Sequence, residues 1–252
     1  MIGVYDSGVG GLSVWKELNA LMPEQGYLYV ADTAHCPYGE KPIDYIIERA
    51  DKVSSFLISQ GAKMVVVACN TATAAAINYL RTKYPIPFVG MEPAVKPAAI
   101  ISKSGVVGVL ATANTFKGRL YRDTVMKYCS KTKVIEVVGK GLVEAVESGT
   151  SAKELLNEYI TSLTGQGADV LVLGCTHFPF LTDEIKAVAP SDMTIINPAP
   201  AVALQAQKIA ATISLDGGKK LFYSTGSTTS LERIAKTIDN NLTADSFIHI
   251  NI

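Results

Sequence analysis

The sequence lacks the features that would place it in a membrane or nucleic-acid-binding class. No apolar run approaches the roughly 18 residues that a membrane-spanning helix needs, and no basic block is present. Lys and Arg total 23, as do Asp and Glu, so the formal net charge is zero. The start "MIGVYDSGVGG" has no basic segment followed by a long apolar one, so we expect no signal peptide. These absences favour a cytoplasmic protein without nucleic-acid or membrane partners.

Recognisable metal, disulfide and nucleotide motifs are also missing. The four cysteines, Cys36, Cys69, Cys129 and Cys175, form no CxxC pair, which argues against a zinc ribbon and a disulfide scaffold. Neither an HExxH motif nor a P-loop occurs, and "DSGVGG" departs from GxGxxG because Ser13 stands at the third glycine position. We therefore expect no bound metal and no dinucleotide.

What the chain does contain is a regular alternation of short apolar runs and longer helical patterns. Hydrophobic residues make up 48% of the sequence and charged residues 18%, which is enough to build a sizeable core. The continuously apolar, β-branched runs predict an α/β fold with mainly parallel sheets flanked by helices. Strands are predicted at 2–5, 27–31, 64–68, 88–90, 106–110, 133–138, 170–173, 194–196 and 221–224, and helices at 43–60, 73–84, 116–128, 151–163 and 199–213.

An internal repeat predicts two pseudo-symmetric domains. "GAKMVVVAC" ending at Cys69 matches "GADVLVLGC" ending at Cys175, 106 residues later, and "GVYDS" matches "GVLAT" at an offset of 105 residues. Proline-rich crossings, "YPIPFVGMEPAVKP" and "NPAPA", separate the two copies. We expect one domain to comprise residues 1–92 with 205–252 and the other to comprise 93–204, with the active site at their interface.

Polar residues follow four of the predicted strands. In open parallel sheets, ligands bind beyond the carboxyl ends of the strands. If the two halves face each other, the thiols of Cys69 and Cys175 point into one cleft from opposite sides. The strand-end residues are Asp6 and Ser7, Cys69, Asn70 and Thr71, Thr112, and Cys175, Thr176 and His177.

Each of these residues also has a plain structural interpretation. A single cysteine at the end of a buried strand is usually a small core residue, and we assign Cys36 and Cys129 mainly to that class. Asp6 could serve only as a turn or capping carboxylate. His177 lies two residues after Cys175, and in an extended chain positions i and i+2 project to the same side. Cys69 and Cys175 differ from these because they occupy repeated positions. Each also precedes a new helix, whose N-terminus favours the thiolate form. We therefore expect these two cysteines to be catalytic.

Two thiols on opposite sides of one carbon suit the inversion of a chiral centre. One thiolate removes the proton and the opposing thiol delivers one to the other face. A single base tends to return the proton to the side from which it came. Near-symmetric halves fit a reaction whose substrate and product are mirror images.

At these residues the sequence resembles the glutamate racemases of the aspartate/glutamate racemase family. The motifs "DSGVGGLSV", "ADTAHCPYGEK", "ACNTATA" and "GCTHFPF" occur in family order across essentially the whole chain. The resemblance implies a cofactor-independent enzyme that makes D-glutamate for peptidoglycan from L-glutamate. It implies that Cys69 and Cys175 are the catalytic bases, with Asp6, His177 and Glu147 assisting. The implied substrate-binding residues are Asp6, Ser7, Tyr38, Gly39, Asn70, Thr71, Thr112, Thr176 and His177.

Several alternatives stay open at this point. The residues support inversion chemistry better than they define the substrate, so aspartate or another amino acid competes with glutamate. A protein that only binds an amino acid, with inert cysteines, is a rival from another class. The assisting acid lies between Glu144 and Glu147, and alignment with the family favours Glu147. A homodimer is possible, but the sequence does not decide the oligomeric state.

Overall fold

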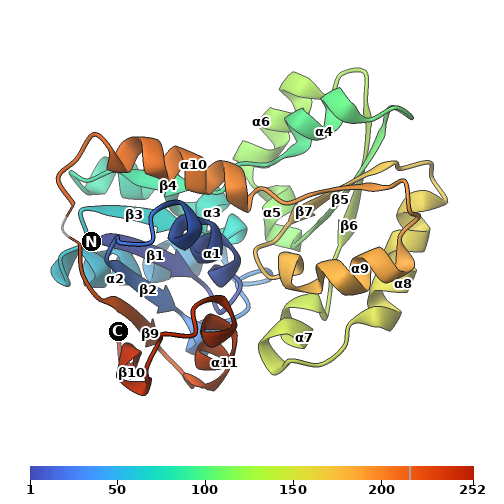
Figure 1. The fold of residues 1–252 in the computed structure, drawn as a ribbon. Coiled ribbons are helices and arrows are strands. Elements are labelled where there is room, and N and C mark those ends of the chain that lie inside the picture. Colours follow the sequence, from blue (N-terminus) through green and yellow to red (C-terminus); the bar gives the residue numbers. More distant parts are fainter. Residues whose placement is uncertain (216) are drawn as a thin grey trace.

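Two parallel sheets dominate the structure, a computed structural model that describes residues 1–215 and 217–252 (Figure 1). The larger sheet has the strand order β10-β9-β2-β1-β3-β4 and the smaller one β6-β5-β7-β8, and all pairs between these strands are parallel. The strands are β1 (Ile2–Asp6), β2 (Tyr27–Ala31), β3 (Met64–Val67), β4 (Phe88–Gly90), β5 (Val106–Ala111), β6 (Lys133–Val138), β7 (Val170–Gly174), β8 (Thr194–Ile196), β9 (Lys220–Ser224) and β10 (Phe247–His249). This confirms the predicted α/β fold with two sheets.

The two sheets share one internal plan. The order β2-β1-β3-β4 in the larger sheet corresponds to β6-β5-β7-β8 in the smaller one. The pairing register agrees with the sequence repeat, because Gly3 lies opposite Val65 and Gly108 lies opposite Leu171. Each of these pairs maps onto the other at the repeat offsets of 105 and 106 residues. The carboxyl ends of β3 and β7, where the repeated cysteines follow, are therefore equivalent places.

Helices cover both sheets, as expected for buried parallel strands. The helix α10 packs along α1 beside the larger sheet, while α8 and α9 pack together on the smaller one (Figure 1). The helices are α1 (Leu12–Leu21), α2 (Ile43–Ser59), α3 (Asn70–Lys83), α4 (Val95–Ile101), α5 (Ala113–Lys117), α6 (Arg119–Tyr128), α7 (Leu142–Ser148), α8 (Lys153–Thr164), α9 (Thr182–Val188), α10 (Ala199–Ala210) and α11 (Thr229–Ile238). None in the described part of the chain is long and apolar enough to span a membrane.

Three predicted helices differ from the structure, and the one predicted at 73–84 begins earlier, at Asn70. The predicted helix at 116–128 is divided into α5 and α6 at Gly118, whose backbone is extended with ψ 136°. A Cβ there would lie 2.7 Å from the Ala74 Cβ, so close packing on α3 accompanies the break. The predicted helix at 199–213 ends earlier, at Ala210. The predicted domain boundary between 204 and 205 falls inside α10, and the division into domains stays a prediction.

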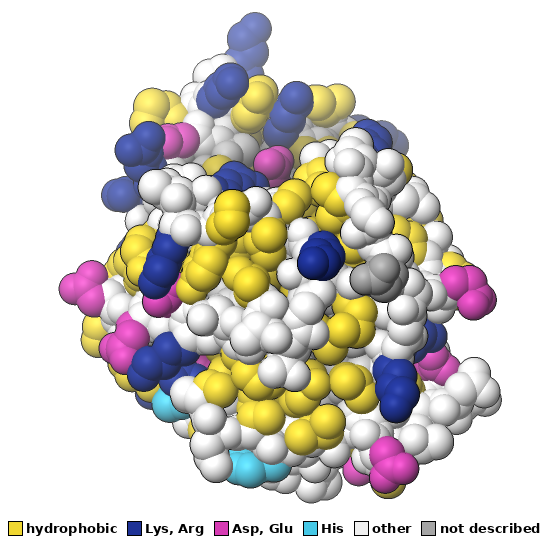
Figure 2. All heavy atoms as spheres, turned by 90° about the vertical axis from the view of Figure 1, so that its left-hand side faces the viewer, with side chains coloured by type: hydrophobic (Ala, Val, Ile, Leu, Met, Phe, Trp, Pro, Cys, Tyr) yellow, Lys and Arg dark blue, Asp and Glu magenta, His cyan; other side chains and the backbone are white. Residues whose placement is uncertain are grey.

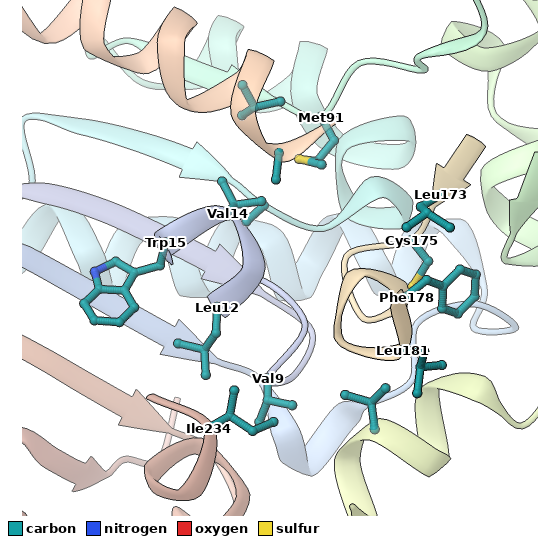
Figure 3. Packing of buried hydrophobic residues seen from close by; sticks show 14 of the residues in the cluster. Val9, Leu12, Val14, Trp15, Met91, Leu173, Cys175, Phe178, Leu181 and Ile234 are labelled. Carbon is teal, nitrogen blue, oxygen red and sulfur yellow. The ribbon is translucent and has the colours of Figure 1, made fainter. Parts of the chain in front are cut away.

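The core continues between the two halves of the molecule. Val9, Leu12 and Met91, which belong to the first half, lie in one hydrophobic cluster with Cys175 and Phe178 of the second half (Figure 3). On the surface, the face at the left of Figure 1 carries hydrophobic side chains between scattered charges of both signs (Figure 2). The buried cluster fixes how the two sets of strand ends meet.

Candidate active site

A cavity lies where the carboxyl ends of the two sheets meet. Both Cys69 and Cys175 line it, so the two repeated strand ends contribute to one site. Its volume is about 10 Å³, which is room for roughly one water molecule. The lining residues are Ser7, Pro37, Tyr38, Gly39, Cys69, Asn70, Thr71, Thr112, Val143, Cys175, Thr176 and His177.

The first thiol, that of Cys69, caps a helix. Cys69 follows β3 and is the N-cap of α3, and its Sγ accepts a hydrogen bond from the Ala72 amide at 3.4 Å. The thiol also lies 3.8 Å from Ser7 Oγ, to which it donates. Burial, reinforced by the negative charge of Asp6, raises the pKa of the Cys69 thiol to about 12 and outweighs these bonds. This sulfur is therefore protonated near neutral pH and is equipped to donate a proton.

The carboxylate of Asp6 joins the two halves of the site. Asp6 ends β1 and is fully buried. It accepts hydrogen bonds from the Gly8 amide and from the Thr176 hydroxyl, both at 2.8 Å. Burial raises the pKa of Asp6, while the nearby His177 charge and these donors oppose that rise. Asp6 thus influences the first thiol by its charge and contacts the second half through Thr176.

The second thiol, that of Cys175, lies beside an imidazole. His177 Nδ1 is 3.8 Å from Cys175 Sγ, and His177 Nε2 is 2.7 Å from Glu147 Oε1. The backbone of His177 forms part of a turn, with φ −73° and ψ −33°. The sequence analysis had assumed an extended backbone here, so that part of the prediction was wrong. Burial alone would lower the pKa of His177, but its hydrogen bonds to Cys175, Cys36 and Glu147 raise it well above the ordinary value. An imidazolium in this position stabilises negative charge on the adjacent sulfur.

The acid at this imidazole is Glu147, and Glu144 is exposed on the same helix α7. Glu147 Oε1 also accepts the Val9 amide at 2.8 Å. Burial would raise the pKa of Glu147, but the hydrogen bonds and positive charge of His177, together with the Val9 amide, lower it. Glu147 therefore carries a negative charge facing the imidazolium.

The glycines of "DSGVGG" allow this approach. A Cβ at Gly8 would lie 1.9 Å from Glu147 Oε1, and a Cβ at Gly10 would lie 2.3 Å from His177 Nδ1. Any side chain at either position would displace the ionic pair. The glycines of this loop, which does not match a dinucleotide motif, allow the backbone to pack closely on Glu147 and His177.

Hydroxyl and amide groups line the remaining wall. Thr71 Oγ1, at the start of α3, lies 2.8 Å from Thr112 Oγ1, which caps α5 in the other half. Asn70 Oδ1 is buried and, within the described residues, has no hydrogen-bond partner. A buried amide oxygen in that condition favours a ligand with an N–H donor, such as an ammonium group.

The loop after β2 brings Tyr38 and Gly39 to the cavity. Tyr38 donates a hydrogen bond to Asp32, and Tyr5 donates one to the Tyr38 hydroxyl at 3.1 Å. Asp32 is fixed from behind by Arg49, with an Nη2–Oδ1 distance of 2.8 Å and both side chains buried. This buried ion pair holds the tyrosine against the cavity, and sequence reasoning did not identify it.

Sequence reasoning also missed the position of Cys36. It was assigned mainly to the buried structural class, but its Sγ lies 3.6 Å from Glu147 Oε1. The repeat contains a signal for this contact, because β2 and β6 occupy equivalent places in the two sheets. Cys36 follows the first of these strands, and the helix with Glu147 follows the second. The other cysteine of that class, Cys129, is buried against the Val95 carbonyl, away from the cavity lining.

Comparison with known proteins identifies the family of the chain. Residues 11–206 match the family model described as Asp/Glu/Hydantoin racemase. A glutamate racemase of Ectopseudomonas mendocina is 48% identical over 213 residues, which cover 82% of this chain and 81% of that protein.

Solved structures of related enzymes have the same fold. The glutamate racemase isoform RacE1 of Bacillus anthracis superposes with a TM-score of 0.87 at 31% identity, covering 100% of this chain and 97% of that one. The Escherichia coli glutamate racemase, solved with L-glutamate and the activator UDP-MurNAc-ala, superposes with a TM-score of 0.88 at 28% identity. The match covers 98% of this chain and 96% of that one.

Proposed function

Because the chain belongs to the Asp/Glu/hydantoin racemase family, we propose that it interconverts L-glutamate and D-glutamate without a cofactor. Cys69 and Cys175 act on opposite faces of the substrate Cα. The observation that carries this proposal is that both strand-end cysteines, one from each sheet, line a single cavity. An amino-acid-binding protein would not need two thiols there.

The two thiols have different surroundings, which suits one acid and one base at a time. Cys69 holds its proton because its pKa is raised to about 12. Cys175 lies beside the imidazolium of His177, which stabilises negative charge on its sulfur. In this state the Cys175 thiolate removes the Cα proton of L-glutamate and the Cys69 thiol delivers its own proton to the opposite face. The products are D-glutamate, a Cys175 thiol and a Cys69 thiolate, from which the reverse reaction begins.

Charge that develops on the substrate during proton transfer needs stabilisation. Asn70 and Thr71, in the first turn of α3, line the cavity, and the start of a helix offers backbone N–H groups without intrahelical partners. Preorganised donors of this kind stabilise a developing anion most effectively where water is excluded. Asn70 Oδ1 is available for the substrate ammonium. Tyr38 and Gly39 also line the cavity.

Glutamate is the substrate we propose because relatives that are 47–48% identical to this chain are named glutamate racemases, and the Escherichia coli structure contains L-glutamate. The product would supply D-glutamate for peptidoglycan, and we propose that this occurs in the cytoplasm. Racemisation of aspartate is the competing substrate choice.

The test follows proton exchange and inversion together. We expect L-glutamate in deuterated water to lose optical rotation while deuterium enters Cα, and L-aspartate to react far more slowly. Exchange without inversion, or neither process, would contradict the two-base proposal.

Single substitutions test the two bases separately. Cys69→Ser and Cys175→Ser should each nearly abolish racemisation, since a serine hydroxyl is a far poorer base than a thiolate. With a substrate that eliminates a leaving group after deprotonation, the two variants should prefer opposite enantiomers. Cys129→Ser is the matched control, because that thiol lies outside the cavity lining. Near-normal racemisation in both variants would remove the basis of the proposal.

A further inference from the structure

Three side chains that are far apart in the sequence meet beside the cavity. Cys36 comes from the loop after β2, Glu147 from α7 and His177 from the turn after β7. Glu147 Oε1 lies 2.7 Å from His177 Nε2 and 3.6 Å from Cys36 Sγ, and the three atoms all lie within 4.8 Å of one another. Two of these groups belong to the proposed racemase site, but Cys36 has no role in the reaction described above.

A thiol, an imidazole nitrogen and a carboxylate oxygen are the ligands that zinc prefers in proteins. With zinc–ligand bonds of about 2.0–2.3 Å, ligand atoms in a tetrahedral site are roughly 3.3–3.8 Å apart. The Cys36–Glu147 separation of 3.6 Å is in this range, and the Glu147–His177 pair has to open by less than about 1 Å.

We propose that Cys36, Glu147 and His177 form a binding site for a thiophilic divalent cation such as Zn²⁺. Binding replaces the thiol proton of Cys36 and the Nε2 proton of His177, and both protons go to the solvent. The cation takes Sγ, Oε1 and Nε2 as ligands, and a water molecule completes the tetrahedron. A site that contains sulfur and nitrogen discriminates against Mg²⁺ and Ca²⁺, which prefer oxygen ligands.

The surroundings support the site in two ways. The Glu147 side chain is 22% exposed and Cys36 is half-buried, so a cation from solution can reach them. The Val9 amide already orients Glu147 Oε1 at 2.8 Å. Outer contacts of this kind position ligands and strengthen metal sites.

Occupation of the site would stop the reaction proposed for this enzyme. A cation on Nε2 replaces the hydrogen bond between His177 and Glu147 and fixes the imidazole in the metal site, so His177 can no longer adjust as the adjacent Cys175 loses and regains its proton. Because every turnover uses both thiols, racemisation falls in both directions. This consequence rests on the proposed function, whereas the binding itself does not.

Cobalt provides a direct probe of the ligands. Titrating the full-length protein with Co²⁺ should produce a near-ultraviolet band from thiolate-to-cobalt charge transfer, with visible bands typical of four-coordination and a stoichiometry of one. Cys36→Ser should remove the charge-transfer band and weaken Zn²⁺ binding, measured by competition against Co²⁺, by at least about 10-fold. Cys129→Ser is the matched control and should retain both signals. Circular dichroism should show that each variant is folded.

Activity measurements separate this proposal from the proposed function. Zn²⁺ should inhibit racemisation by the unaltered protein, EDTA should reverse the inhibition, and Cys36→Ser should require at least about 10-fold more Zn²⁺ for the same fractional inhibition. If the cobalt band persists in Cys36→Ser and is lost in Cys175→Ser, the metal binds to the cavity thiol and the proposed ligand set is wrong. If no racemisation is detected at all, the cobalt signals still decide whether the site exists.

Discussion

Replacing Glu147 by glutamine removes a charge and keeps the shape of the side chain. In the structure this carboxylate faces the buried imidazole of His177 at 2.7 Å, and the His177 side chain is only 2% exposed. A hydrogen bond to a charged group contributes about 1.5–3 kcal/mol. Converted at RT of about 0.59 kcal/mol, that energy corresponds to a 10- to 150-fold change in the ratio of protonated to neutral imidazole at a fixed pH. We therefore expect His177 in Glu147→Gln to hold its proton less tightly by a factor in this range.

The assay is a ¹⁵N NMR titration of the imidazole rings, alongside racemisation rates. The chain contains three histidines, so a His177→Asn spectrum is enough to assign the signal. We expect kcat to fall by a similar 10- to 150-fold, because the Cys175 sulfur loses the imidazolium beside it. Glu144→Gln is the control, since that carboxylate is exposed on the same helix. An unchanged His177 titration in Glu147→Gln, or an equal effect of Glu144→Gln, would refute the assignment of the acid.

The same variant changes how stability depends on pH. Folding lowers the pKa of Glu147, so this group stabilises the native state above its ordinary value of 4.5, and the contribution is lost as the pH falls through the folded value. Folding raises the pKa of His177, so its contribution is present below 6.5 and is lost as the pH rises through the folded value. Both contributions are complete between these two ordinary values. The loss of unfolding free energy in Glu147→Gln should therefore be largest there, as urea denaturation at several pH values would measure.

Three further predictions concern packing and protonation. Gly10→Ala places a Cβ 2.3 Å from His177 Nδ1, so racemisation should fall at least about 10-fold with the circular dichroism spectrum unchanged; normal kcat would contradict the close approach. Because the pKa of Cys69 is about 12, the ultraviolet absorbance of its thiolate, measured as the difference between the unaltered protein and Cys69→Ser, should be absent at pH 8 and grow only as the pH is raised toward that value; a full thiolate signal at pH 8 would contradict the raised pKa. Arg49→Met leaves Asp32 buried without its ion pair, so the free energy of unfolding in urea should fall by about 3–5 kcal/mol; a loss below about 1 kcal/mol would mean that the pair is not needed.

The parts of this fold that depend on local sequence could be predicted. The strands are short apolar runs whose side chains are buried in the structure, as in β3, and the polar residues that follow them lie at the sheet edges where parallel strands place ligands. The helix α1 was not predicted, because it starts directly after a glycine-rich loop and its N-cap, Gly11, offers no side-chain cap. The break at Gly118 depends on contact with a helix distant in sequence.

The parts of the site that depend on contacts between the two halves could not be derived from local sequence. Which of Glu144 and Glu147 contacts His177 depends on which face of α7 packs against it. The sequence favoured Glu147 only through its resemblance to the family. Cys36 lies 111 residues from its carboxylate neighbour, so no local spacing reveals their contact. The buried pair of Asp32 and Arg49 is likewise formed by residues whose types are more often exposed.

The hydrogen bonds between the halves have a consequence for the timing of each turnover. The cavity has space for roughly one water molecule, so a glutamate can enter or leave only if the two sheets move apart. The Thr176–Asp6 and Val9–Glu147 hydrogen bonds join the two halves, so we expect this movement to break them. The same hydrogen bonds hold Asp6 and Glu147 near Cys69 and His177, so admission of the substrate and the alignment of these groups depend on the same contacts.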